Sequence, residues 1–141
     1  MGKSKASGKQ PERKHAGLLA APPLLVNYDL QTPKFCLRHL QPGFDIAELD
    51  AAGKASFAEA LFKRARMNWS EITTAPKHGL GSEFIPAGRI KPSIPEAFQD
   101  ADRFLVLRYD GKLPMAGIRA LDVLHILWIE RTFNTLYDHG S

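Results

Sequence analysis

Apolar and polar positions follow their clearest pattern between residues 103 and 129, where three apolar runs are separated by two turn signals. Asp110-Gly111 separates the first two runs and favours a type I′ hairpin, because both central residues of that turn need positive φ. Ala120-Leu-Asp122 is a second, weaker turn signal. The third run is apolar on both faces apart from one histidine, as in a central strand covered on both sides. The pattern predicts an antiparallel meander.

A helical period replaces this alternation upstream of the meander. Between residues 54 and 66 apolar side chains recur at intervals of three and four, which is typical of an amphipathic helix. Asn68-Trp-Ser-Glu71 matches a capping box that opens a second, short helix, and Pro76 ends it. We expect the two helices to form a hairpin on the sheet. Three apolar side chains of the first helix should pack against one sheet face: Phe57, Leu61 and Phe62.

The first 44 residues differ in composition from the rest of the chain. Residues 1–16 are rich in Gly, Ser, Lys and Gln and predict a disordered basic tail. Residues 17–44 are proline-rich and predict an extended arm, in which 34–40 alternates loosely enough for a first strand. We therefore expect one α+β domain over 45–141, a helical hairpin packed on a small antiparallel sheet.

Charge is unevenly distributed along the sequence. The net charge is +4, and residues 1–15 hold five basic side chains against Glu12 alone, so the rest of the chain is formally neutral. Such a tail attracts nucleic acid or any anionic surface weakly, or is simply a solvated terminus. A single cysteine, Cys36, excludes an internal disulfide. No apolar run approaches the roughly 20 residues needed to span a bilayer, and we expect a cytoplasmic protein without a membrane partner.

Three arginines stand at strand ends or beside turns of the meander: Arg108, Arg119 and Arg131. A guanidinium is a planar fork of donors that stays charged, and this suits phosphate binding. The three converge if the strands are offset. Without an offset, alternating strand direction puts Arg108 and Arg119 at opposite ends, and each arginine pairs with a nearby carboxylate instead.

Four side chains are candidates for proton transfer: His78, Glu83, Tyr137 and His139. Histidine titrates near neutral pH, and burial can raise the pKa of a carboxyl toward that range. His78 and Glu83 lie on a glycine-rich stretch that we expect to be exposed, and His139 is close enough to the end to fray. His125, centred in an apolar strand, is more typical of a hydrogen-bonded core histidine. The histidines show no metal-ligand spacing, and no cofactor-binding loop is recognisable.

The order of these elements resembles the RelE/ParE-type toxins of bacterial toxin–antitoxin systems, over about residues 45–139. A helical hairpin is followed by strands of the type Leu-Arg-Tyr, Gly-Ile-Arg and Val-Leu-His-Ile-Leu-Trp-Ile-Glu-Arg, and then by Leu-Tyr-Asp-His. The resemblance implies a RelE-like fold, attack of an mRNA 2′-hydroxyl on the neighbouring phosphate at the ribosome, and a cognate antitoxin protein. By similarity Glu83 is the base, Arg108 and Arg131 hold the phosphate, and Tyr137 with His139 forms the terminal acid or stacking pair.

Further contacts with RNA are expected from His78, Lys112 and Arg119. Two other functions remain open: a non-catalytic protein-interaction module that uses the sheet and the long loop 86–102, and a small nucleic-acid-binding regulator. The neutral body favours the interaction module, whereas the strand-end arginines favour RNA.

Overall fold

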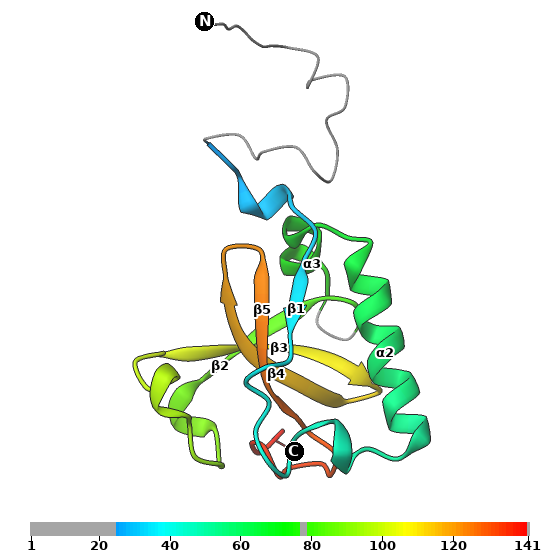
Figure 1. Ribbon diagram of the computed structural model, residues 1–141, viewed down its shortest axis with the longest axis vertical. Coiled ribbons are helices and arrows are strands. Elements are labelled where there is room, and N and C mark those ends of the chain that lie inside the picture. The colour runs from blue at the N-terminus through cyan, green and yellow to red at the C-terminus, as the bar shows by residue number, and fades with distance from the viewer. Residues whose placement is uncertain (1–24, 77–78, 141) are drawn as a thin grey trace, which may run out of the picture.

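The computed structural model describes residues 25–76 and 79–140, which form one five-stranded sheet with the helices along one side of it (Figure 1). The predicted tail, residues 1–16, and His78 lie outside the described residues. No helix in the described part of the chain is long and apolar enough to cross a membrane.

The strands run in the spatial order β1-β5-β4-β3-β2. They are β1 (Lys34–Cys36), β2 (Ser82–Pro86), β3 (Arg103–Asp110), β4 (Leu113–Ala120) and β5 (Val123–Ile129). The α-helices are α2 (Ala51–Ala65) and α3 (Trp69–Thr74), and short 3-10 helices occur at Tyr28–Leu30, Ile46–Glu48, Ala87–Arg89 and Glu96–Phe98. The α+β class and the meander are confirmed.

The sheet is mixed, so the prediction of a wholly antiparallel sheet was wrong. β2, β3, β4 and β5 pair with their neighbours antiparallel, but β1 pairs with β5 in parallel. The first strand therefore covers only part of the predicted segment 34–40, and it joins the arm to the sheet. The two helices then carry the chain from β1 at one edge of the sheet to β2 at the other edge.

The helix starts follow from side chains that cap them. Asp50 accepts a hydrogen bond from the Gly53 N–H at 2.7 Å, so α2 begins three residues before the predicted start. Asn68 and Glu71 form the predicted reciprocal capping box of α3.

The sheet separates two hydrophobic clusters because successive strand residues point to opposite faces. The first, under α2 and α3, contains Leu49, Phe57, Ala60, Trp69, Ile72, Leu105, Leu107, Tyr109, Met115, Leu124, Ile126 and Ile129. The second lies under the loops of the other face and contains Ile85, Ile90, Phe104, Val106, Ala116, Leu127, Trp128, Leu136 and Tyr137. Each face of the central strands is therefore covered.

A bulge in β5 assigns Trp128 to the second cluster. Gly117 pairs with Ile126 whereas Ala116 pairs with Trp128, so Leu127 is an extra residue on β5. Simple alternation would place Trp128 under the helices, but the bulge turns it over to meet Phe104 edge-to-face at 5.0 Å. Gly117 is required at this point, because a Cβ there would overlap the backbone carbonyl of His125.

The prediction that Phe57, Leu61 and Phe62 share the core was right for Phe57 and wrong for Phe62. Phe57 is 4% exposed, Leu61 is half-buried, and Phe62 is 58% exposed with the Arg66 guanidinium 5.7 Å from its ring centre. Positions five apart on a helix differ by about 140° around the axis, since one turn takes 3.6 residues. Phe57 and Phe62 therefore cannot both face the sheet.

This pair of phenylalanines allows a matched test of the packing. Phe57→Ala should lower the free energy of unfolding by about 3–5 kcal/mol, because it leaves a cavity under the sheet. Phe62→Ala, on the same helix, should lower it by about 1 kcal/mol at most, including the lost Arg66 contact. Urea unfolding measures both values. Equal losses from the two variants would mean that α2 presents a different face to the sheet.

Candidate functional site

The segment that follows β5 folds back over the second hydrophobic cluster because a buried carboxylate holds it there. Glu130 is 0% exposed. Its Oε2 accepts a hydrogen bond from the Leu136 N–H at 2.9 Å, and its Oε1 lies 2.7 Å from Nε2 of His139. A buried carboxylate is costly unless it is hydrogen-bonded and paired. These contacts therefore hold residues 136–139 in place. His139 does not fray, although its position in the sequence suggested that it would.

Three aromatic rings of this segment pack together. The His139 ring lies 4.0 Å from that of Phe133, nearly parallel at 19°, and 4.3 Å from that of Tyr137 at 31°. Tyr137 is 3% exposed and Phe133 is 41% exposed. The predicted pairing of Tyr137 with His139 is thus present as a direct ring contact.

Charged side chains from three parts of the chain act on the Tyr137 hydroxyl. The pKa of Tyr137 is raised from 10.0 to about 12, chiefly by burial and then by the negative charges of Glu83 and Glu130, while the positive charges of Arg108 and Arg89 oppose the shift. Tyr137 consequently keeps its proton at neutral pH. We call this group the C-terminal cluster; its members are Glu83, Arg89, Arg108, Glu130, Tyr137 and His139.

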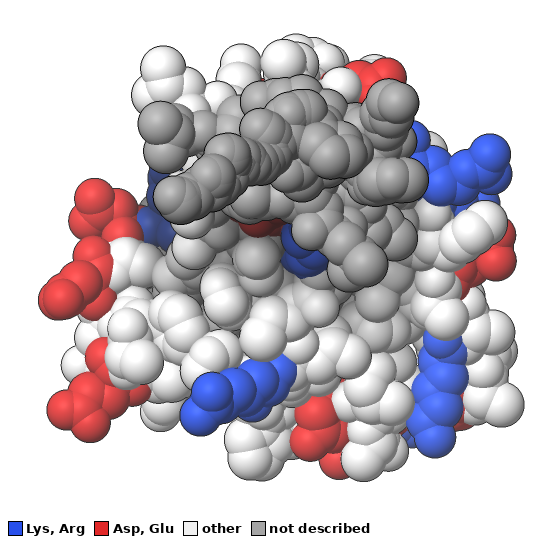
Figure 2. Space-filling view, turned by 45° about the horizontal axis from the view of Figure 1, so that its top comes forward, with Lys and Arg blue, Asp and Glu red and all other residues white. Residues whose placement is uncertain are grey.

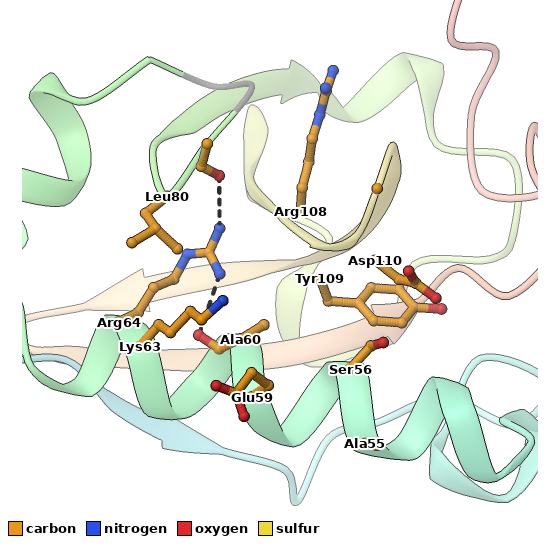
Figure 3. Close-up of a pocket in the computed structure, with 12 residues that line it drawn as sticks. Ala55, Ser56, Glu59, Ala60, Lys63, Arg64, Leu80, Arg108, Tyr109 and Asp110 are labelled. Atoms are coloured by element: carbon orange, nitrogen blue, oxygen red, sulfur yellow. Dashed lines mark hydrogen bonds between the residues drawn. The ribbon is translucent and has the colours of Figure 1, made fainter.

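Strand register brings Glu83 and Arg108 to the same face. Glu83 pairs with Val106, and Arg108 is two residues beyond Val106 on β3, so all three side chains share a face. Val106 belongs to the second hydrophobic cluster, and Figure 3 shows the Arg108 side chain pointing away from α2. Glu83 is half-buried on β2, which corrects the expectation of an exposed glycine-rich loop. The β-favouring pair Phe84-Ile85 was the sequence signal for this strand.

Arg89 was missed by the sequence analysis. It ends the 3-10 helix Ala87–Arg89, donates to the Asp138 carbonyl oxygen at 2.7 Å, and lies 5.9 Å from the centre of the Tyr137 ring. Lys91 adds a backbone bond to the Leu136 carbonyl and an ion pair to Asp138 at 2.7 Å, and its hydrogen bond lowers the pKa of that carboxyl. The loop 86–102 is therefore a wall of the cluster. The only sequence signal for this wall was the pair of basic residues, Arg89 and Lys91, in a long loop.

Arg119 does not join Arg108, so the predicted convergence of these two arginines was wrong. Arg119 pairs with Leu124 and Arg108 with Pro114, which places them toward opposite ends of β4. The Arg119 guanidinium instead forms an ion pair with Asp29 at 2.7 Å and lies 4.5 Å from the Trp69 ring centre. Arg119 therefore forms a structural ion pair, which was the alternative prediction, and its partner is a carboxylate of the arm.

Three other residues that the sequence analysis considered form no hydrogen bond with the cluster among the described residues. Lys112, next to the β3–β4 turn, and Arg131 are exposed, and neither forms a hydrogen bond or ion pair within residues 25–76 and 79–140. Their contacts with RNA remain predictions. His125 is half-buried, and its Nδ1 has no hydrogen-bond partner in the described part of the chain, contrary to the expectation of a hydrogen-bonded core histidine.

One face of the molecule carries mixed charge. On the face seen in Figure 2, basic and acidic side chains are interspersed among neutral ones, in keeping with the formally neutral body. No group of three or more His, Cys, Asp or Glu in the described residues is arranged to hold a metal ion. The cluster itself offers carboxylate, phenol and imidazole groups, which can transfer protons, beside two guanidinium groups.

Alkaline titration tests the environment of the buried tyrosines. Burial raises the pKa of Tyr109 and of Tyr137 from 10.0 to about 12. The unfolded chain loses these protons first, so their contribution to stability is complete below pH 10 and is lost as pH rises through 12. Urea unfolding across this range should show falling stability, with a shallower fall in Tyr137→Phe. Ionisation of Tyr137 near pH 10 in the folded protein, seen by ultraviolet titration, would contradict the packing described.

Comparisons with known proteins identify no family for this chain. No protein-family description matches it, and neither the curated proteins nor the solved structures contain a match. Its function is accordingly inferred from the residues of the C-terminal cluster.

Proposed function

We propose that the protein is an RNA-cleaving toxin of RelE-like type, which attacks mRNA through the 2′-hydroxyl and is neutralised by a partner antitoxin protein. One observation carries this proposal. A carboxylate on β2 and a guanidinium on β3 share one face of the sheet, and the charges of both act on the protonated Tyr137 after β5, although the three residues are far apart in sequence. RNA transesterification needs a base, a proton donor and cations at the phosphate.

The side chains fit distinct steps of that reaction. Glu83 takes the proton of the 2′-hydroxyl, whose oxygen forms a bond to the adjacent phosphorus as the bond from phosphorus to the 5′-oxygen breaks. The products are a 2′,3′-cyclic phosphate and a 5′-hydroxyl. Tyr137 keeps its proton at neutral pH and donates a hydrogen bond to the phosphate. His139, held by Glu130, supplies the proton of the leaving oxygen.

Guanidinium groups balance the charge that develops on the phosphate. Arg108 and Arg89 both act on the Tyr137 hydroxyl, so a phosphate next to that hydroxyl also lies within their field. Arg131 follows Glu130 and is exposed, and it adds a cation beside the cluster. Lys112 extends the proposed RNA contacts to the β3–β4 turn.

Paired variants test the catalytic roles. Inducing the protein in a bacterial host should arrest growth with cleavage of translated messages. Glu83→Gln keeps the shape of the side chain and removes the base, and Arg108→Ala removes a phosphate contact; each should lower the cleavage rate by about 10²–10³-fold and relieve the arrest. Arg103→Ala is the matched control on β3, because Arg103 stacks 3.8 Å from the Phe84 ring centre outside the cluster. It should remain active.

A modified substrate tests the chemistry itself. RNA with a single 2′-deoxy nucleotide at the cleaved position should resist the purified protein, because the attacking oxygen is absent. Cleavage of that substrate, or an arrest that survives both variants, would exclude the mechanism.

The runner-up is a protein-interaction module, favoured by the edge of the sheet. β2 is an edge strand, and it carries Phe84 at 48% exposure. An edge strand can accept a strand from another chain. Absence of both growth arrest and RNA cleavage from the wild-type protein would favour this function.

A further inference from the structure

A buried cation stands on α2 without a counter-charge. Arg64 is 1% exposed, the most deeply buried basic side chain among the described residues. It forms no ion pair within that part of the chain. Arginine is almost never fully buried unless it is paired. Burial lowers the pKa of Arg64 to about 10, so it still carries its charge at neutral pH.

Its hydrogen bonds are few and long. The guanidinium has five N–H donors. It donates to the Ala60 carbonyl at 3.3 Å and to the Gly79 carbonyl at 3.4 Å, both longer than the usual 2.9–3.0 Å. Nε has no partner among the described residues. Backbone carbonyls therefore satisfy only part of a group that prefers a planar pair of oxygens.

This side chain lines an open groove between α2 and the β3–β4 turn, shown in Figure 3. The groove has a volume of about 800 Å³. Small residues of α2 form part of its wall, with Lys63 next to Arg64, and the opposite wall includes Tyr109, Asp110 and Gly111. Three basic residues, Lys63, Arg64 and Arg108, and two acidic residues, Glu59 and Asp110, thus line a space large enough for a small ligand.

We propose that this groove is an oxyanion-binding site, in which Arg64 and Lys63 hold a carboxylate or phosphate group of a small ligand. The bound oxyanion would supply both the charge and the acceptors that Arg64 lacks. The site goes beyond the RNA-cleaving function, because neither Arg64 nor Lys63 takes part in the proposed cleavage. The groove adjoins the C-terminal cluster, since Arg108 lines the groove and also belongs to that cluster.

A purely structural role for Arg64 makes the opposite prediction about its removal. If Arg64 only ties the 79–80 segment to α2, its replacement must destabilise the protein whatever anion is present. If it is an unpaired charge awaiting an anion, Arg64→Met should leave stability unchanged or raise it in chloride, because apolar replacement of buried charge is often neutral or stabilising. The same variant should lose any response to oxyanions.

The test compares melting temperatures in chloride, acetate and inorganic phosphate at matched ionic strength. Phosphate stabilises many proteins by exclusion from their surface, so the measure is the difference between wild type and Arg64→Met. Arg66→Met is the matched control, because Arg66 is an exposed arginine on the same helix. In the bound oxyanion, the melting temperatures of wild type and Arg66→Met should rise by several degrees, whereas that of Arg64→Met should not. A rise in melting temperature in phosphate alone identifies a phosphate ligand, and a rise in acetate alone identifies a carboxylate ligand.

A second measurement decides the matter if Arg64→Met does not fold. The Nε–H resonance of Arg64 in the wild-type protein should shift saturably with the same anion, and Lys63→Ala should weaken that titration. The proposal would be overturned if the melting temperature rose equally in Arg64→Met and wild type, or rose in neither anion. It would also be overturned if the Arg64 resonance did not move.

Discussion

The carboxylate of Glu130 decides where residues 131–140 lie. Every polar group of Glu130 has a partner: its N–H donates to the Pro114 carbonyl, its carbonyl accepts from the Tyr109 hydroxyl at 2.6 Å, and its carboxylate holds Leu136 and His139. Removing any partner would leave a buried donor or acceptor unpaired, which costs more than the bond itself contributes. The chain after β5 is therefore committed to return over the sheet. Tyr137 consequently lies where the charges of Glu83 on β2 and Arg108 on β3 act on its hydroxyl.

The bulge in β5 and the turn at its start shape both sides of this arrangement. With Leu127 as the extra residue, Leu127 and Trp128 both face the second cluster, and they build the apolar floor on which Tyr137 and Leu136 pack. Leu121 takes a positive φ in the β4–β5 turn, and the Trp69 indole donates to the Asp122 carbonyl at 2.9 Å, which fastens α3 to that turn. Helix packing and the candidate site are thus set by opposite faces of the same strands.

The sequence predicted what depends on local chemistry. The hairpin turn after Asp110, the capping box at Asn68 and the apolar run of β5 each act within a few residues, and the structure has all three. The predicted turn type was wrong, because Gly111 takes a positive φ and Asp110 does not, whereas a type I′ turn centred on these two residues needs both. The parallel pairing of β1 and the ends to which Arg108 and Arg119 belong depend on register between distant segments. A register shift of one residue reverses which face a side chain occupies, so periodicity alone could not place Glu83 or Trp128. Arg89 and Glu130 were missed for a related reason, since Arg89 lies in a long loop and the side-chain partners of both residues lie in the C-terminal segment.

Glu130 and Arg64 are the two charged side chains that are fully buried in the described part of the chain, and they differ in one physical respect. Glu130 has its counter-charge and donors from within the fold, so its burial stabilises one conformation of the C-terminal segment. Arg64 has two long bonds to carbonyls and a groove in front of it. Desolvation costs both groups several kcal/mol, but only Glu130 recovers that cost from the fold. A protein that retains a buried charge without a partner gives up stability, and a bound oxyanion would return part of it. The proposed ligand binding in the Arg64 groove would therefore be coupled to folding stability.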